Sequence, residues 1–546
     1  MDTPEQQSQP DAAADAPTVA NPAIHEEPTA ETPAAVDATQ VFPVLMAEIT
    51  DEVPLVSDRP VRAPGYRRPH LTFVAVACVF GLALAVVLPP LAGFDEGVHF
   101  LRAWHISNGH VGAETGHRVN DPTRDLGAYV PEGLDRGLRT LLLDGILRPD
   151  NARRVWSHVG DAAPSGPPTF VDFSAAAVYP PVPYLPSAAG IRVGRLFGAS
   201  PFVLVLLARM AELAAFIALM ALAIRRLPSR RWVLVVLALT PVALFQAATI
   251  SADAITNAFA ALVIADALAL TTCDEGAVPR GLVIETVLAT VALALCKQPY
   301  ILAAGLLLLP AWRHRRQIGA VIVATFVVSG SVALVWTHWA NDHYLAPDFL
   351  PPVLGGHANY ANNNVQPKDQ LAYLRGHPFA FAGAVGRMIA DHGASIAHDM
   401  FVQVSYWHVP GLIAVLAAVA LVAIVVVDAG RLPGGAAMRI LGLVLAAATV
   451  VISLFLAYVG WNAVRAPRID GYQGRYLVVV LTLVALLAMP YRAASRVRPH
   501  DPGDGRSTGM LVSREGRIDT IALVVVACTG ALLLVIVIGL GWHAYR

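Results

Sequence analysis

Long apolar segments recur along this chain, and they constrain its fold more than any other feature of the sequence. The first begins at Leu71 and the last ends at Trp542, and most reach about the 20 residues that a helix needs to cross a bilayer. The segments 281–296 and 299–312 are barely long enough, and a single re-entrant pair is the alternative there. Hydrophobic residues make up 55% of the chain and charged residues only 14%, whereas about a quarter of a soluble domain is charged. The sequence therefore predicts an all-α polytopic membrane protein.

The apolar segments indicate about eleven transmembrane helices. We expect them at residues 71–92, 201–224, 231–250, 253–271, 281–296, 299–312, 318–338, 406–428, 437–459, 475–491 and 518–541. Clusters of Arg, which mark cytoplasmic loops, lie at residues 59–68, 225–231, 313–316, 431–439 and 492–517. This alternation places the N-terminus in the cytoplasm and the C-terminus outside, with outer loops at 93–200, 339–405 and 460–474.

The first 58 residues differ from the rest in charge. They hold twelve acidic side chains and no Lys or Arg, which leaves 28 acidic against 39 basic side chains in the remainder, a net charge of +11 there. Because this segment has few aromatic residues, it cannot bury enough apolar surface to offset its ordering entropy. We predict that residues 1–70 are a disordered acidic cytoplasmic tail ending in a basic juxtamembrane segment, and that 71–546 are the transmembrane domain.

Two segments of the first outer loop, 138–148 and 183–197, mix apolar residues with Arg at roughly helical spacing. Such segments suit helices that lie in the membrane interface. The large first outer loop is therefore expected to contain interfacial helices.

Asp95 and Glu96 form an acidic pair a few residues after the first span. Partial desolvation at a membrane face raises the pKa of a carboxyl group and makes it a better general base, so both are candidate catalytic residues. On a following helix, His99 and Arg102 would face the pair and bind substrate. Alternatively, an acidic pair at a helix start acts only as a cap.

The histidines of the same segment do not indicate a metal site. His99, His105 and His110 are separated by six and five residues, which does not place ligands together on one face of a helix. We therefore predict no histidine-built metal site and no certain cofactor. A divalent cation held between a lipid phosphate and Asp95 or Glu96 stays open.

Polar residues also stand at the outer ends of later spans. Asp253 and Asn257 lie four residues apart on one face at the membrane edge, where unpaired polar groups are costly and commonly functional. A hydrogen-bonded pair that joins two helices is the alternative. Lys297, one of two lysines in the chain, could neutralise a phosphate or extend to lipid headgroups.

The last outer loop carries three arginines against one acid. Arg outside works against the insertion bias, and its forked guanidinium suits phosphate. The residues that we predict to bind substrate here are Arg468, Gln473, Arg475 and Tyr476. A salt bridge from Arg475 to Asp95 or Asp253 is the alternative.

Six motifs follow one another along the chain. They read FDEGVHFLRAWHISNGH from Phe94, YPPVPYLPSAAGIRVGRLFG from Tyr179, ISADAITNAF from Ile250, KQPY from Lys297, QLAYLRGHP from Gln370 and DGYQGRY from Asp470. In this order they resemble the bacterial membrane family called domain of unknown function 2142, from Leu71 to about Tyr491. Gly97 and Val98 depart from that family's usual DEPAHF, whereas Asp95, Glu96 and His99 match it.

That family resembles the GT-C glycosyltransferases, membrane enzymes that use polyprenyl-phosphate-linked sugars and keep a catalytic acid in their first outer loop. The resemblance implies that Asp95 or Glu96 is that acid. It also implies transfer of a sugar to a cell-envelope glycan or lipid-linked acceptor at the outer face of a bacterial plasma membrane. The partners would be the donor, the acceptor and the bilayer, with no nucleic acid.

Two other functions fit the sequence. A transporter or flippase of lipid-linked sugars predicts charged residues deep in several spans and an internal repeat, and the one intramembrane pair that we expect is Arg209 with Glu212. A non-enzymatic membrane protein of envelope assembly predicts instead that the outer carboxylates are dispensable.

Overall fold

The described part of the computed structural model covers residues 68–117, 124–147, 149–344, 365–404, 409–430, 432–487 and 506–545. The predicted acidic tail lies outside these residues up to residue 67, as do most of the predicted basic loop 492–517 and the stretch 345–364 of the second outer loop. Residues Gly65–Arg546 form one compact unit.

Long apolar runs fold into helices, which satisfy their own backbone hydrogen bonds and can therefore lie in lipid. Among the described residues, six helical stretches are long and apolar enough to cross a membrane. They lie in α2 (Pro69–Val87), α7 (Pro201–Arg226), α10 (Ala252–Thr271), η5 with α13 (Arg315–Gly319 and Ala320–Tyr344), α18 (Gly435–Gly460) and α20 (Arg506–Tyr545). Two shorter apolar stretches are α17 (Gly411–Val427) and η6 with α19 (Gly474–Leu477 and Val478–Leu487).

The other predicted spans are present as shorter helices with breaks between them, so the number eleven is not confirmed. α8 (Arg231–Ala238) and α9 (Pro241–Ala247) occupy one predicted span, and Pro241, which has no backbone N–H, accounts for the break. Two further predicted spans correspond to α11 (Arg280–Ala294), η4 (Gln298–Leu307) and α12 (Leu308–Arg313).

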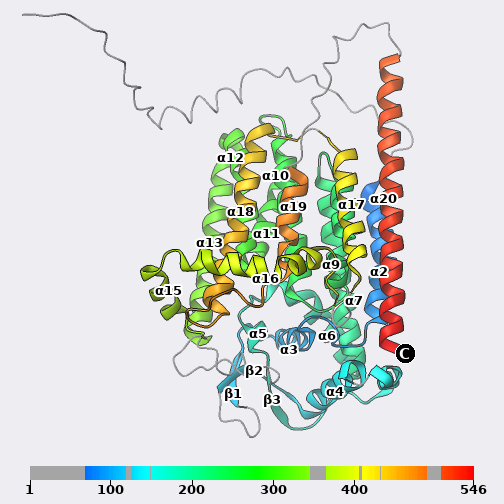
Figure 1. Ribbon diagram of the computed structural model, residues 1–546, viewed down its shortest axis with the longest axis vertical. Coiled ribbons are helices and arrows are strands. Elements are labelled where there is room, and N and C mark those ends of the chain that lie inside the picture. The colour runs from blue at the N-terminus through cyan, green and yellow to red at the C-terminus, as the bar shows by residue number, and fades with distance from the viewer. Residues whose placement is uncertain are drawn as a thin grey trace, which may run out of the picture. The chain divides into compact units, whose positions relative to one another are not determined.

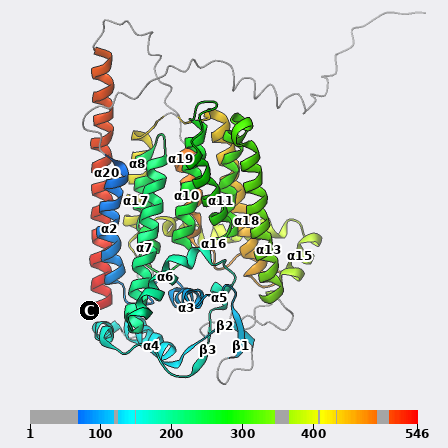
Figure 2. The ribbon, with the colours of Figure 1, turned by 180° about the vertical axis from the view of Figure 1, so that it is seen from behind.

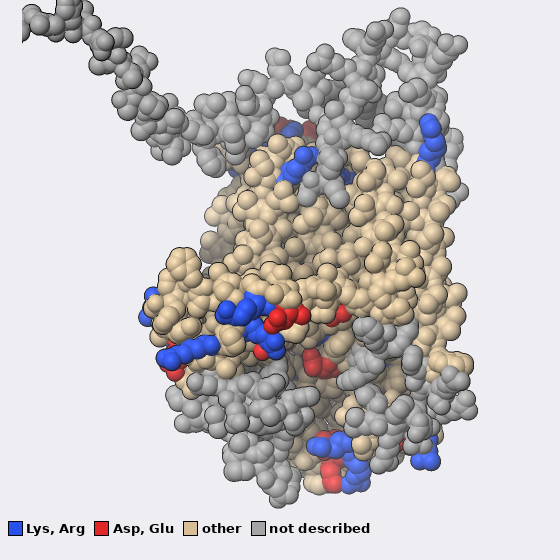
Figure 3. Space-filling model, in the orientation of Figure 1, with Lys and Arg blue, Asp and Glu red and all other residues tan. Residues whose placement is uncertain are grey.

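α10 is the most enclosed of the candidate spans, with 89% of its apolar window buried. It packs against α7, α11, η4 and α19, and its many alanines allow these neighbours to approach closely. α20 packs against α2 and α17, and Figures 1 and 2 both show it alongside α2. On the face that Figure 3 shows, a broad uncharged band separates the charged side chains of the two ends, as expected of a lipid-facing surface.

The segment 93–200, which we predicted to be the first outer loop, contains a small antiparallel sheet, which the prediction of an all-α protein missed. Its strands are β1 (Glu114–His117), β2 (Arg124–Pro131) and β3 (Pro168–Asp172), in the order β1-β2-β3. Ala128 pairs with Val171 at its centre. β1 is short and polar, and β2 contains Gly127 and ends at Pro131, so neither has the sustained alternation that signals a strand.

Helices complete this loop. α3 (Glu96–Ser107) packs against α6 (Leu185–Leu196), which follows η3 (Val182–Tyr184) and in turn packs against α7. The remaining elements are α4 (Glu132–Leu142), η1 (Leu143–Leu147), η2 (Pro149–Gly160) and α5 (Ser174–Ala177). Figure 1 shows α3 to α5 and the sheet gathered at one end of the long helices, with α12 at the opposite end.

The two helices predicted for this loop are present, with one boundary moved. α6 with η3 covers almost the whole of the predicted 183–197. The helix predicted at 138–148 begins earlier, at Glu132, because Pro131 precedes it and the acidic first turn favours a helix start. Pairs between Glu132 and Arg136 and between Asp135 and Arg139 support the added turn.

Two helices of the segment 339–405 lie beside the segment 460–474, and we predicted both segments to be outer loops. They are α15 (Pro367–Gly376) and α16 (Ala380–Val402), and α16 packs against η6. A Cβ atom at Gly474 would lie 2.3 Å from the carbonyl oxygen of Ile396 and 2.3 Å from the backbone nitrogen of Met400. Only glycine permits this approach, which brings the start of η6 against α16.

Candidate functional site

Asp95 immediately precedes α3, in the left-handed region of backbone conformation at φ +54°. Asp tolerates this region better than most residues, but the conformation still costs free energy, and such positions cluster at functional sites. Its side chain makes no capping hydrogen bond to α3 and is 61% exposed. The structure therefore gives no support for a side-chain cap by Asp95, although this residue stands at the N-cap position of α3.

Glu96 lies next to Asp95 in sequence but in a different environment, because its side chain is fully buried. Arg209 of α7 donates to both carboxylate oxygens, from Nε to Oε1 at 2.7 Å and from Nη2 to Oε2 at 2.6 Å. The backbone N–H groups of Gly93 and Ile250 also donate to this carboxylate, at 2.8 Å and 3.1 Å. Four donors therefore occupy Glu96, and it joins the start of α3 to α7 and to the segment before α10.

Three charged side chains from distant parts of the chain meet beside Asp95. We call the four residues the charge cluster: Asp95, Asp253, Lys297 and Arg475. Lys297 Nζ donates to Asp253 Oδ1. Arg475 lies between the two acids, with Nη2 at 3.5 Å from Asp95 Oδ2 and Nε at 3.6 Å from Asp253 Oδ2. The cluster holds two carboxylates and two cations, and of the four side chains only Asp95 is substantially exposed.

Aromatic rings line the two cations. Lys297 Nζ lies 4.8 Å from the centre of the Tyr179 ring and 5.0 Å from that of Tyr476. The Arg475 guanidinium carbon lies 4.8 Å from the ring centre of Phe94 and 5.4 Å from that of Tyr476. Ring faces attract cations and fix their positions, so the two positive charges are held in place on the buried side of the cluster.

The side chain of Arg475 has unused hydrogen-bonding capacity. Its contact with Asp95 is longer than the roughly 2.7–2.9 Å of a strong charge-assisted hydrogen bond, and its buried Nε has no hydrogen-bond partner among the described residues. Its backbone, in contrast, is fixed: the N–H donates to Gln403 Oε1 at 3.3 Å, and Gln403 Nε2 donates to Gln473 Oε1 at 3.0 Å. Gln473 therefore contributes by positioning the chain.

His99 borders the charge cluster from α3. Its Nδ1 is 2.8 Å from the hydroxyl oxygen of Tyr184, and its ring stacks on that of Tyr179. Burial lowers the pKa of His99 to about 4, although the negative charge of Asp95 opposes the shift. The ring is therefore neutral at pH 7.

Three residues that we predicted to bind substrate lie outside the charge cluster. Arg102 donates from Nη2 to the carbonyl oxygens of Val111 and Tyr179, at 2.6 Å and 3.3 Å. Asn257 donates to Gln246 Oε1 at 3.0 Å, which supports the alternative of a pair between helical segments. Arg468 forms ion pairs at the surface, with Asp391 at 3.2 Å and with Asp470 at 2.8 Å.

The expected pair between Arg209 and Glu212 is wrong. Arg209 binds Glu96 and the carbonyl oxygens that end α2, whereas Glu212 accepts a hydrogen bond from Ser187 at 2.5 Å. A spacing of three residues on a helix permits a pair but does not require it.

Sequence reasoning overlooked the aromatic lining and the role of Arg209. Tyr179 belongs to a motif that we read only as the approach to a helix, and Phe94 directly precedes Asp95. The rarity of Arg inside an apolar span did single out Arg209, but no sequence signal showed that its partner is Glu96 rather than Glu212.

Residues 78–484 match a protein family described as predicted membrane protein (DUF2142), and the matched segment is more than half of the chain. It contains all four residues of the charge cluster and the Glu96–Arg209 pair. No curated protein and no solved structure shows significant similarity to the chain. The chain belongs to the family of predicted membrane proteins DUF2142.

Proposed function

We propose that this protein is a membrane glycosyltransferase that resembles the GT-C enzymes and acts at the outer face of a bacterial plasma membrane. It would transfer a sugar from a polyprenyl-phosphate donor to a cell-envelope glycan or a lipid-linked acceptor. One observation carries the proposal: an exposed carboxylate, Asp95, faces a buried arginine, Arg475, whose Nε has no hydrogen-bond partner among the described residues.

Asp95 is the proposed general base, and Glu96 is not. Of the two adjacent carboxylates, only Asp95 is accessible to an acceptor molecule, because Glu96 is fully buried and accepts four hydrogen bonds. A base must come within hydrogen-bond distance of the proton that it removes. The role of Glu96 in this proposal is to hold α3, and hence Asp95, in position through Arg209.

The proposed reaction is a single inverting displacement. An acceptor oxygen attacks the anomeric carbon of the donor sugar and forms the new glycosidic bond, while its proton passes to the Asp95 carboxylate. The bond between the anomeric carbon and the phosphate oxygen breaks, and its electron pair leaves with the polyprenyl phosphate. Arg475 and Lys297 stabilise the negative charge of that phosphate, because preorganised cations in a site shielded from water act strongly on developing charge.

The proposal assigns the phosphate to Arg475 and Lys297 rather than to Arg468. Two carboxylates, Asp391 and Asp470, already occupy the guanidinium of Arg468 at the surface. Arg475 instead keeps donor capacity, and the side chain of Asp95, which is exposed and only 3.5 Å from Arg475 at its closest, can swing away. A phosphate oxygen would then complete the hydrogen bonding of Arg475.

The test is transfer by the purified protein in detergent, with polyprenyl-phosphate sugars and envelope acceptors extracted from cells that lack the gene. Mass spectrometry of such cells should first show which donor accumulates and which glycan residue is missing. Asp391→Asn is a matched control for Asp95→Asn, because Asp391 is also an exposed aspartate paired with an arginine. Loss of transfer in Asp95→Asn alone is expected, and full transfer by Asp95→Asn would overturn the proposal.

A transporter or flippase of lipid-linked sugars is the second candidate, and buried carboxylates within two spans favour it. Glu212 in α7 and Asp266 in α10 are both fully buried, and one oxygen of each has no hydrogen-bond partner among the described residues. Such groups within spans commonly mark transport pathways. A flippase would show no transfer in detergent, and its loss would leave the lipid-linked sugar on the cytoplasmic leaflet.

A further inference from the structure

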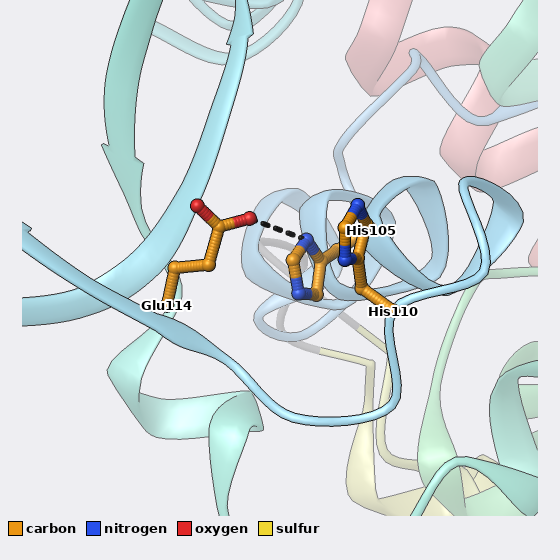
Figure 4. A group of neighbouring side chains, drawn as sticks. All are labelled: His105, His110 and Glu114. Carbon is orange, nitrogen blue, oxygen red and sulfur yellow. Dashed lines mark ion pairs between the residues drawn. The ribbon is translucent and has the colours of Figure 1, made fainter.

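A second group of polar side chains lies at the other end of α3 from Asp95. One ring nitrogen each of His105 and His110 and one carboxylate oxygen of Glu114 all lie within 4.8 Å of one another. Figure 4 shows that they come from three successive segments: α3, the turn after it and strand β1. With about 1.5 Å of rise per residue, α3 separates this group from Asp95 by roughly 15 Å, so it is distinct from the charge cluster.

The end of α3 brings the two histidines together. Gly109 adopts φ +90°, its N–H donates to the carbonyl of Ile106 at 2.8 Å, and the N–H of His110 donates to the carbonyl of His105 at 3.4 Å. These two bonds define the Schellman motif, in which the second residue after the helix returns to the third residue from its end. The rings of His105 and His110 consequently stack, with centres 4.7 Å apart. Our prediction of no histidine site assumed a continuous helix and did not consider this reversal.

The hydrogen bond made by His105 determines which of its nitrogens is free. Nε2 lies 2.6 Å from the carbonyl oxygen of Gly112, which can only accept, so Nε2 carries the proton and donates. Nδ1 therefore presents a lone pair.

Two acceptors therefore face each other at this site. His105 Nδ1 lies 3.7 Å from a carboxylate oxygen of Glu114, with a lone pair on one side and a negative charge on the other. Two ligands bound to one tetrahedral zinc ion at about 2.0–2.1 Å stand roughly 3.3 Å apart. From this geometry we propose that His105, His110 and Glu114 bind a divalent transition-metal ion, for which Zn²⁺ is the best match.

The ligand types favour zinc over the alkaline-earth ions. Imidazole nitrogen suits zinc and its neighbours, whereas Mg²⁺ and Ca²⁺ prefer sites made of oxygen alone. The backbone carbonyl that accepts from His105 is the outer partner that ligating histidines usually have, since it fixes ring orientation. Three protein ligands leave a fourth position for water, as in open zinc sites.

The metal would connect the end of α3 to the sheet of the first outer loop. Glu114 begins β1 and pairs with Gly127 of β2, so an ion shared with His105 and His110 ties the helix to that strand. Closure of a loop by a metal stabilises the folded state, because the preformed site exists only there. This proposal is independent of the transfer reaction, and its test does not use activity.

Zinc content of the full-length protein tests the site. The protein is purified in detergent with a histidine-free affinity tag, stripped with a chelator, dialysed against limiting Zn²⁺ and analysed by plasma mass spectrometry. The variants are His110→Ala and Glu114→Gln, whose side chains are exposed enough to change without loss of folding. His377→Ala is the matched control, since His377 is an exposed histidine of another outer segment.

The wild type and His377→Ala should each retain one more zinc ion per chain than His110→Ala and Glu114→Gln. In a chelator competition, each of these two variants should bind at least about 10-fold more weakly, because even loss of an outer partner weakens zinc binding by about 10–100-fold. Added Zn²⁺ should also raise the Tm of the wild type but not that of His110→Ala. Equal zinc content and equal affinity in wild type and His110→Ala would overturn the proposal.

Discussion

Replacement of Glu96 and of Asp95 should have opposite consequences, although the two carboxylates are adjacent in sequence. Glu96→Gln should destabilise the fold, whereas Asp95→Asn should leave the fold intact and abolish transfer. The structural basis is the difference in environment: Glu96 is fully buried against Arg209, and Asp95 is 61% exposed beside Arg475.

The magnitudes follow from these environments. Glu96→Gln removes the carboxylate that pairs with the buried guanidinium of Arg209, and breaking a buried pair in this way costs about 3–5 kcal/mol. Asp95 has a single 3.5 Å contact with Arg475, and exposed pairs of this kind contribute about 0.2–1 kcal/mol. Loss of a general base lowers turnover by about two to four orders of magnitude with donor binding largely kept.

Thermal unfolding of the detergent-solubilised protein, measured beside sugar transfer, separates the two effects. Glu96→Gln should have a clearly lower Tm and a low yield, and Asp95→Asn should match the wild type in both. The double variant Glu96→Met with Arg209→Met is the internal control. It removes both charges and should be less destabilised than Glu96→Met or Arg209→Met alone, because neither charge is left unpaired.

Either of two results for Glu96→Gln would refute this reasoning. If Glu96→Gln unfolds at the wild-type Tm, its carboxylate does not hold α3 to α7, and the division of roles between the two acids fails. If Glu96→Gln folds normally but loses transfer, the base is Glu96 and not Asp95.

Three further predictions concern the phosphate, the orientation and the tail. Arg475→Lys keeps the charge but loses the guanidinium fork, so it should raise the KM for the donor and lower kcat; unchanged kinetics would remove Arg475 from the site. The orientation is tested in a protein whose four native cysteines are replaced by Ala. In intact cells, Ala163→Cys should react with a membrane-impermeant thiol reagent and Glu275→Cys should not. The reverse pattern would invert the predicted orientation. Deletion of residues 1–58 should leave transfer at the wild-type rate, because a tail that lies in the cytoplasm, as we predict, cannot reach an outer site. Loss of transfer by a well-expressed deletion protein would contradict this.

Much of the helical architecture and part of the site could be predicted because both depend on local signals. A long uninterrupted apolar segment predicts a transmembrane helix. A charged side chain at a membrane edge is conspicuous because placing it there costs free energy. Asp95, Asp253 and Lys297 were singled out by their position at a membrane edge, and Arg475 because Arg outside works against the insertion bias. The structure brings these four together. The alternative of a salt bridge from Arg475 to Asp95 or Asp253 also agrees with the structure.

The partners of these charges could not be predicted, because they depend on tertiary packing. Glu96 binds Arg209, which is 113 residues away, rather than capping its own helix. The same limit explains the expected but wrong pair of Arg209 with Glu212. That expectation considered only residues of the same helix, whereas Arg209 donates to Glu96 of α3 and to carbonyl oxygens at the end of α2. The break at Pro241 and the reversal at Gly109 have local sequence signals that a search for uninterrupted apolar or helical periodicity passes over.

The order in which the charge cluster is synthesised has a consequence for how the protein is made. Asp253 and Lys297 are 44 residues apart and can neutralise each other early, while the ribosome is still translating the later helices. Arg475 lies 380 residues after Asp95, so it reaches the insertion machinery last. We expect membrane insertion to pass through an intermediate in which Asp95 is exposed and does not yet have Arg475 beside it. Chains that terminate before Arg475 would keep the Asp95 carboxylate at the bilayer without Arg475. Quality-control proteases could distinguish such chains from finished molecules.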